Sequence, residues 1–356
     1  MRTNFFLFII TALLLPDISE AQKVTFDARI CTWYQDKDAA VSVSFDDACF
    51  TQFTYAYPVL EKYDIKATFS LVGEWTHDEP TFSAEPEAFE IKKMGWEQLR
   101  TLSKHGHELA AHGMHHRPYK RNASTDSLAR DMRQVKELIE SHTGANVYTI
   151  HYPYSLTSDS ITKAAQKAGY LFGRTGEMEI NPDTPANFYL LSSEAILNDT
   201  TPNLEAYKNW LVQAQGKWLI LMYHHLFPRA SKAMHIMNYH HVRHTYSLFP
   251  STFDKQMQIL SASGYWVAPI ADVGRYIQER NATNISTTKF FRTYKIKTNS
   301  CLNSGIYPVP LSIKVHIPWK KVVVKGSLHD GLYKVVDGTL VLDFMPGDTL
   351  IIKKKS

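Results

Sequence analysis

Cysteine is scarce in this 356-residue chain, which contains only Cys31, Cys49 and Cys301. An odd number excludes a framework in which every cysteine is paired. A bridge between Cys31 and Cys49 is open to a protein in an oxidising compartment. Buried free thiols are the interpretation that we favour.

Blocks of like charge and long apolar runs are also missing over most of the chain. The formal charge at pH 7 is +4 and the one basic block is the terminal KKK, so nucleic acid is not an expected partner. Beyond the N-terminal segment, no stretch is long enough to span a membrane. A hydrophobic content of 44% and a charged content of 21% are typical of a globular protein, here long enough for two domains.

The N-terminal segment holds a strongly apolar run, FFLFIITALLLP, preceded by Arg2. Ser19 and Ala21 supply small residues at the −3 and −1 positions of a cleavage site. The run is too short for a membrane anchor. We therefore predict a signal peptide over residues 1–21, cleaved near Ala21, and a secreted or periplasmic protein with no transmembrane segment in its mature chain. The oligomeric state is left open.

Between about residues 39 and 270, short apolar runs alternate with amphipathic helical stretches. The runs VSVSF, ATFSLVG, HELAAH, VYTIHYP and KWLILMYHH are each followed by a helical pattern, and most of these patterns end at or beside Gly. Such alternation predicts an α/β fold, either an α/β barrel or a doubly wound sheet.

After about residue 286 the pattern changes to Val- and Ile-rich alternation with turn signals such as HDG and VDG. This pattern predicts a small antiparallel β domain over residues 286–356, after a catalytic domain over residues 22–285. Segments such as VVVKG and TLVLDF are typical of core strands. We therefore expect this domain to brace the first one rather than to bind glycan.

Two acidic side chains, Asp46 and Asp47, end the strand-like run VSVSFDDACF. Neighbouring side chains on a strand point to opposite faces. One carboxylate can therefore bind a metal ion while the other handles a proton. The alternative is a helix N-cap, because Asp favours that position.

Two histidines, His112 and His116, lie four residues apart in HELAAHGMHHRPY. If the segment turns helically, both imidazoles fall on one face, as two metal ligands require. A chance pair is the alternative. We interpret His105 as a surface residue and His107 as structural.

Two further strand ends carry polar groups. In VYTIHYPYS, Pro153 stiffens a loop in which Tyr154 can present a backbone N–H to developing negative charge, although an ordinary turn is the simpler interpretation. The run KWLILMYHHLF ends at His224, which can act as an acid or base, or be purely structural. In parallel α/β architectures these strand ends converge on one site.

Together these motifs resemble the polysaccharide deacetylases of the NodB-homology type, carbohydrate esterase family 4. SFDD resembles the first motif, HGMHH the second, YPY the end of the third and LMYHH the late Leu-x-His motif. ATFSLVG, GHELAAH and SGYWVAPIADVGRYIQER also resemble segments of this domain. The resemblance covers about residues 39–278 and implies a deformed (β/α) barrel.

The resemblance also implies a role for each motif. Asp47, His112 and His116 would bind a divalent metal ion, zinc first, with cobalt, manganese or nickel as alternatives. Asp46 would be the general base and His224 the general acid. The backbone N–H of Tyr154 would stabilise the oxyanion while an acetyl group is removed from an N-acetylated sugar of a glycan.

Two departures from the family pattern affect this reading. The third motif usually carries an Arg where this chain has His151, and we hypothesise that Arg174, in YLFGRTGE, supplies that cation from the next strand. The alternative is a surface or structural Arg174. The usual fourth motif, which contains Asp-Trp, is not evident, so the orientation of His224 is less defined.

Alternatives to the leading function remain. The same fold and metal could serve an O-acetyl carbohydrate esterase acting on acetylated xylan, for example, or a carbohydrate-binding protein with a decayed site. The His-rich segment 235–244 is expected to form a loop over the cleft that contacts substrate, with a second metal site or simple solvated histidines as alternatives.

Overall fold

A computed structural model of the chain describes residues 26–81, 92–120, 123–198, 202–227 and 246–355. The predicted signal peptide and the His-rich segment 235–244 lie outside these residues. No helix in the described ranges has the length and apolar character needed to cross a membrane.

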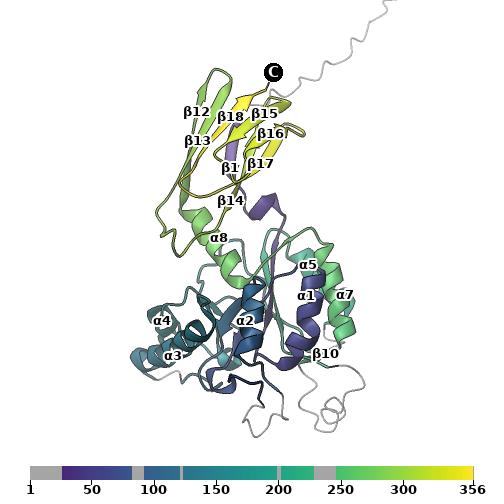
Figure 1. Cartoon of the computed structure of the whole chain (residues 1–356), viewed down its shortest axis with the longest axis vertical. Helices are drawn as coiled ribbons and strands as arrows, with labels where there is room; N and C mark the ends of the chain where they lie inside the picture. Colours follow the sequence, from purple (N-terminus) through teal and green to yellow (C-terminus); the bar gives the residue numbers. More distant parts are fainter. Residues whose placement is uncertain (1–25, 82–91, 121–122, 199–201, 228–245, 356) are drawn as a thin grey trace, which may run out of the picture.

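A curled sheet of parallel strands forms the lower part of the molecule in Figure 1. Seven strands follow one another in the order β6-β5-β4-β3-β2-β8-β7, and the short β11 pairs with β2 outside this path. Every pairing between them is parallel. The strands are β2 (Ala40–Phe45), β3 (Thr68–Leu71), β4 (Glu108–Ala111), β5 (Thr149–His151), β6 (Phe172–Arg174), β7 (Glu194–Ala195), β8 (Trp218–Tyr223) and β11 (Trp266–Val267).

The central strands β2 and β8 are buried along their whole length. Such strands are covered on both faces, which is why their sequences AVSVSF and WLILMY are nearly free of charge. The helices pack against the sheet; α1 to α5 and α7 contribute to the main apolar core, and α8 packs in a smaller cluster with Phe172 and Trp218. They are α1 (Tyr57–Lys62), α2 (Trp96–Lys104), α3 (Thr125–Thr143), α4 (Asp159–Lys167), α5 (Leu204–Gln213), α7 (Pro250–Ser261) and α8 (Ile270–Ala282).

Two antiparallel sheets form the upper part of the molecule (Figure 1) and enclose a second apolar core. One sheet has the order β1-β14-β17 and the other β12-β13-β18-β15-β16. Their strands are β1 (Asp27–Ile30), β12 (Thr283–Phe290), β13 (Thr293–Ser300), β14 (Leu311–His316), β15 (Lys321–Lys325), β16 (Gly331–Lys334), β17 (Thr339–Phe344) and β18 (Thr349–Lys354). The α/β fold class, with a deformed barrel followed by antiparallel β structure, is thereby confirmed.

The first described strand, β1, pairs with β14 and so joins the sheets at the other end of the chain. The pairing runs from Asp27 opposite His316 to Ile30 opposite Ile313. The two strands are therefore separated by almost 300 residues of sequence. The division into residues 22–285 and 286–356 stays a prediction.

The buried cysteines agree with the favoured interpretation. Cys31 and Cys49 are buried and unbridged, and burial raises the pKa of each thiol to about 12. Cys301 is also free but is exposed, contrary to the expectation of a buried thiol.

Helix α8 is seated against the sheet by polar and steric contacts. The partly buried Glu108 accepts a hydrogen bond from the Ala271 N–H at 2.9 Å, which satisfies a free donor of the first helical turn. One turn later, Gly274 lies so close to Phe172 of β6 that a Cβ atom would stand 2.3 Å from the ring. This close approach holds the helix that leads into β12 directly on the strand that ends in Arg174.

We predict that Gly274→Ala lowers the free energy of unfolding by about 1–2 kcal/mol, because overpacking the Phe172 ring outweighs the gain in helix propensity. Chemical denaturation measures the change. The matched control is Gly331→Ala, where a Cβ would meet no atom within 4 Å. Equal stability of the two variants would show that the contact is not tight.

Candidate active site

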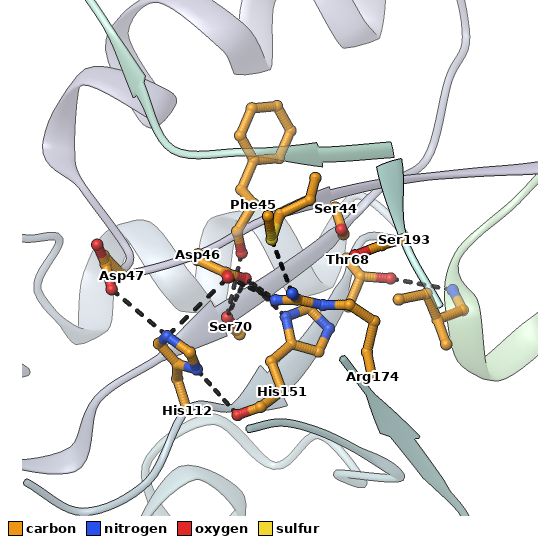
Figure 2. A network of polar contacts seen from close by, with 12 residues as sticks. Ser44, Phe45, Asp46, Asp47, Thr68, Ser70, His112, His151, Arg174 and Ser193 are labelled. Atoms are coloured by element: carbon orange, nitrogen blue, oxygen red, sulfur yellow. Dashed lines mark hydrogen bonds and ion pairs between the residues drawn. The ribbon is translucent and has the colours of Figure 1, made fainter. Parts of the chain in front are cut away.

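The polar residues selected from the sequence lie at the carboxyl ends of neighbouring strands. Asp46 and Asp47 follow β2, His112 follows β4, Arg174 ends β6 and His224 follows β8. Because these strands are parallel neighbours, their ends meet at one edge of the sheet. Figure 2 shows the side chains of Ser70, His112, His151 and Arg174 directed toward Asp46.

The two acidic side chains are separated by a backbone turn rather than by strand alternation. Strand β2 ends at Phe45, and Asp47 and Ala48 adopt φ values of 73° and 47°. Neither Asp is a helix N-cap, since the next helical turn is capped by Thr51. The left-handed turn directs Asp46 toward β5 and β6 and leaves Asp47 facing the two histidines.

The histidine pair comes together on a loop, so the helical turn considered for this segment is wrong. His112 directly follows β4, and Gly113 and His116 adopt φ values of 78° and 48°. This tight reversal brings the two imidazole centroids to 4.9 Å. The His116 ring also packs between Trp75, at 4.7 Å, and Tyr154, at 4.9 Å.

Three donor atoms surround one point at this turn. Asp47 Oδ1 lies 3.6 Å from His112 Nε2 and 3.5 Å from His116 Nε2, and the three groups lie within 4.8 Å of one another. Asp47 Oδ1 is buried and has no hydrogen-bond partner among the described residues. A buried carboxylate oxygen that faces two imidazole nitrogens has the donor chemistry of a divalent metal site.

The protonation states also suit a metal site. His112 Nδ1 bonds the His151 carbonyl oxygen at 2.9 Å, so it carries the proton and leaves the Nε2 lone pair toward Asp47. Burial lowers the pKa of His112 to about 4, so its ring is neutral. Burial opposes ionisation of Asp47, but Lys93 and the nearby histidines outweigh it and lower the pKa of that carboxyl group.

The Asp46 carboxylate is held by three side chains (Figure 2). Arg174 bonds both of its oxygens from β6. His151 Nδ1 lies 2.8 Å from Asp46 Oδ1, and the Ser70 hydroxyl donates to the same oxygen at 3.0 Å. The Arg174 side chain, hypothesised to replace the missing cation, therefore lies beside Asp46.

The second carboxylate oxygen of Asp46 faces the cavity. Asp46 Oδ2 lies 3.8 Å from His224 Nε2 and 4.0 Å from His112 Nε2. Burial alone would raise the pKa of Asp46, but Arg174, His112 and His151 hold it well below its usual range. The group is therefore an anion at neutral pH. Oδ1 is held by His151, Ser70 and Arg174, and Oδ2, which Arg174 alone bonds among the described residues, is turned toward the site.

His224 is positioned by a route that the sequence did not reveal. Among the described residues its Nδ1 has no hydrogen-bond partner, which agrees with the missing fourth motif. Its ring packs 4.5 Å from that of Tyr246, and its carbonyl oxygen accepts a hydrogen bond from Gln52 Nε2 at 2.9 Å. The same amide donates to the Asp46 carbonyl at 2.6 Å, so Gln52 ties the ends of β2 and β8 together. Burial lowers the pKa of His224.

Tyr154 lies in a short 3₁₀ turn, Pro153–Ser155, with φ of 57°. Its side chain is 57% exposed while Pro153 is buried. A rigid turn of this kind fixes the direction of its backbone N–H, which is the group proposed from the sequence to face an oxyanion.

These groups line one cavity of about 380 Å³. That volume lies at the low end of the range for small-molecule sites and is suited to one sugar unit. All seven residues selected from the sequence line it, together with Tyr152, Ser155, Met222, His225 and Tyr246.

Comparison with known proteins finds a family whose model matches part of this chain. Residues 34–173 match the model of the family described as polysaccharide deacetylase. The resemblance to polysaccharide deacetylases predicted from the sequence is thereby confirmed over these residues. The matched segment runs from before β2 to Gly173 in β6. It contains the cavity residues Asp46, Asp47, His112, His116 and Tyr154, whereas Arg174 and His224 lie beyond its end.

Individual proteins with similar sequences share less than a third of their residues with this chain over the aligned segment. The poly-β-1,6-N-acetyl-D-glucosamine N-deacetylase of Staphylococcus aureus strain MSSA476 is 27% identical over 176 residues, which is 48% of this chain and 58% of that protein. The chain thus spans about half the length of the curated relatives that it matches.

Solved structures of the family show lower similarity. The Streptococcus pyogenes deacetylase PplD in complex with acetate has a TM-score of 0.39 and 23% identity, covering 49% of this chain and 69% of that one. A CE4 family pseudoenzyme from Bacillus anthracis, BA3943, has a TM-score of 0.42 and 16% identity, covering 67% and 66%.

The site also contains residues that the sequence analysis did not select. Lys93 is buried, its Nζ lies 3.6 Å from Cys49 Sγ, and it is the first charge that lowers the pKa of Asp47. Asp47, Cys49 and His225 form a second group of donors within 4.8 Å of one another. Lys93 was missed because it follows a polar insertion in which no local pattern indicates a buried cation. Gln52 and Ser70 were missed because they lie in ordinary apolar stretches.

Removing the Arg174 cation should shift the pH dependence of the site. We predict that Arg174→Met raises the pKa of Asp46 and moves the acidic limb of the acetate-release profile to higher pH. The free energy of unfolding should fall by about 3–5 kcal/mol, because a buried charge is left unpaired. Asp46 has a depressed pKa in the folded protein, so its stabilisation is present above the unfolded pKa of about 4 and is lost as pH falls further.

Measurements of acetate release and of denaturant unfolding between pH 3 and pH 8 check both parts. Arg275→Gln, which breaks an ion pair with Asp272 on α8, is the control. A pH–rate profile that is unchanged in the Arg174 variant would rule out its influence on Asp46.

Proposed function

We propose that this protein is a metal-dependent deacetylase that removes acetyl groups from N-acetylated sugars of a polysaccharide or oligosaccharide. The observation that carries the proposal is the arrangement of Asp47, His112 and His116 around one point, with the Oδ2 atom of Asp46 beside it in the same cavity. A relative named as a poly-β-1,6-N-acetyl-D-glucosamine N-deacetylase supports a polymer of N-acetylglucosamine as the substrate class.

The donor set fits a divalent cation with borderline character. One carboxylate oxygen and two neutral imidazoles are the ligands that zinc accepts at catalytic sites, where a further position stays open to water or substrate. Cobalt, manganese and nickel accept the same ligands. When bound, such an ion lowers the pKa of a water ligand and polarises an acyl oxygen.

Asp46 is the proposed general base. Its Oδ1 is occupied by Ser70 and His151, and Arg174 fixes the plane of the carboxylate, so Oδ2 is the oxygen that receives a proton from the attacking water. Arg174 and His151 are the proposed positioning residues, because they keep this oxygen directed into the cavity. The low pKa keeps Asp46 ionised and ready to accept the proton.

Tyr154 and His224 are the proposed partners of the acyl group and the leaving nitrogen. The backbone N–H of Tyr154, on its rigid turn, would donate to the oxygen of the tetrahedral intermediate. An amine does not leave as an anion, so His224 must deliver a proton to it. His224 Nε2 lies 3.8 Å from Asp46 Oδ2, so the proton taken by Asp46 would reach it through one bridging water or after a small movement of the ring.

The compartment belongs to the same proposal. We infer from the N-terminal run and the Ser19–Ala21 pattern that residues 1–21 are removed and that the mature protein acts in the periplasm or outside the cell. Polymeric acetylated glycans are met in those places.

Acetate release, measured with metal content on the same sample, tests the proposed activity. The protein loaded with zinc should release acetate from acetylated glucosamine oligomers, and a chelator should abolish this until metal is restored. Asp47→Asn should lose both metal and activity. Asp46→Asn keeps all three donors, so it should retain metal while the rate falls by about 10²–10⁴.

The opposite result would favour the decayed-site alternative. Glycan binding by the metal-loaded protein without acetate release from any acetylated glycan in a panel would contradict the proposed enzyme.

A His224→Ala variant distinguishes amide from ester chemistry. We predict a loss of about 10²–10⁴ in rate on an N-acetyl substrate, because the departing nitrogen then lacks its proton donor. The loss on an O-acetyl ester should be smaller, since an alcohol leaves more easily. His105→Ala, a histidine on the surface beside Glu61, is the control. Faster wild-type turnover of acetylated xylan than of the amide would favour the esterase alternative.

A further inference from the structure

The hairpin between β12 and β13 presents two aromatic side chains to solvent. Phe290 ends β12 and Phe291 begins the turn to β13, and they are 84% and 79% exposed. We call residues 289–292 the hairpin tip. These rings are the two most exposed of the large hydrophobic side chains in the described part of the chain, and so add little to its apolar cores.

The tight turn of the hairpin tip requires a left-handed residue, and a bulky aromatic residue occupies that position. Phe291 adopts a φ of 50°, in the left-handed region that a bulky side chain avoids. Gly or Asn would make the same tight turn at lower cost. A strained, exposed aromatic residue points to a role outside the folding of this chain.

Positive charge surrounds the hairpin tip. Residues 283–300 and 349–355 contain no Asp or Glu. The register places Lys353 opposite Thr293, next to the turn, and the Lys354 N–H donates to the Arg292 carbonyl. The cations of these two segments are Lys289, Arg292, Lys295, Lys297, Lys353, Lys354 and Lys355.

The hairpin tip and the cavity lie at opposite ends of the molecule. Figure 1 shows the turn between β12 and β13 at the end farthest from the parallel sheet, beside the C-terminus. Strand β10 (Ser247–Leu248), which follows the cavity residue Tyr246, lies near the other end. Phe26, the first described residue, lies at the same end as the tip, since its ring stacks on Tyr294 with centroids 3.6 Å apart.

We propose that the hairpin tip binds an anionic lipid surface, with Phe290 and Phe291 entering the headgroup region and the surrounding lysines facing the lipid phosphates. Phenyl rings at an interface gain from burial of apolar area, and each nearby cation adds attraction to anionic lipids. The two exposed rings and the cations nearest them, Lys289, Arg292 and Lys353, supply both contributions at the hairpin tip, and the other lysines extend the positive charge along the strands.

A glycan fits the same surface less well. Residues 289–292 have no carboxylate or amide side chain to bond sugar hydroxyls. The product of the proposed deacetylation is a cationic polymer, which this basic surface would repel. A bilayer bound here would leave the cavity directed away from the membrane, toward a polymer outside it.

Vesicle partitioning tests the proposal. The wild-type protein, expressed from Gln22 so that the N-terminal apolar run does not contribute, is mixed with phosphatidylcholine vesicles containing or lacking phosphatidylglycerol. We expect binding to the anionic vesicles that weakens with salt. Phe290→Ser/Phe291→Gly should bind about 10–100-fold more weakly while its melting temperature is unchanged or higher, because the strained turn is relieved.

Two controls distinguish binding through the hairpin tip from non-specific hydrophobic binding. Val212→Ser removes another exposed apolar side chain, on α5, and should bind vesicles as the wild type does. Acetate release from a soluble acetylated oligomer should be the same in the wild type and the double variant. Vesicle binding is measured separately, so it tests the hairpin tip even if no acetate is released.

The proposal is overturned by three results. Wild-type protein that ignores anionic vesicles excludes a lipid surface, and a double variant that binds them normally excludes the hairpin tip. A double variant with weaker affinity for acetylated glucosamine polymer, but normal vesicle binding, would make the tip a glycan site.

Discussion

A buried ion pair between Asp46 and Arg174 is the interaction on which the site depends. A carboxylate taken out of water is unstable without a partner, and here a guanidinium from β6, an imidazole from β5 and a hydroxyl from β3 surround it. Only a sheet curled so that β2, β3, β5 and β6 face a common centre can supply them together. The buried charge of Asp46 therefore depends on the curvature of the sheet, which brings its partners together.

The same arrangement fixes the donors around Asp47. The ring of His151 bonds Asp46, and its carbonyl oxygen accepts a hydrogen bond from Nδ1 of His112. This bond turns Nε2 of His112 toward Asp47. Gln52 bonds the carbonyl oxygens of Asp46 and His224 and keeps the ends of β2 and β8 in register. Two chemically different carboxylates, one held for proton transfer and one open to a cation, follow from a single left-handed turn at Asp47.

The two ends of the molecule differ in what they offer. The carboxyl ends of the parallel strands gather buried charge in a cavity, where low solvent access strengthens each polar contact. The antiparallel sheets bury their Val- and Ile-rich faces in a separate core and leave a basic, aromatic hairpin tip outside. The bracing role expected of these sheets is compatible with that surface, because the core strands and the tip use different residues.

The sequence by itself determined the alternation of strands and helices, the antiparallel texture after residue 286, and the polar groups at four strand ends. These features are local, since periodicity and composition report which face of an element is buried. Tertiary structure alone decided that Arg174, 128 residues from Asp46, would meet its carboxylate, that Lys93 would lie under Asp47, and that β1 would pair with β14. It also replaced the helical turn considered for His112 and His116 with a loop. Such contacts depend on how strands order and curl in space, which no short stretch of sequence encodes.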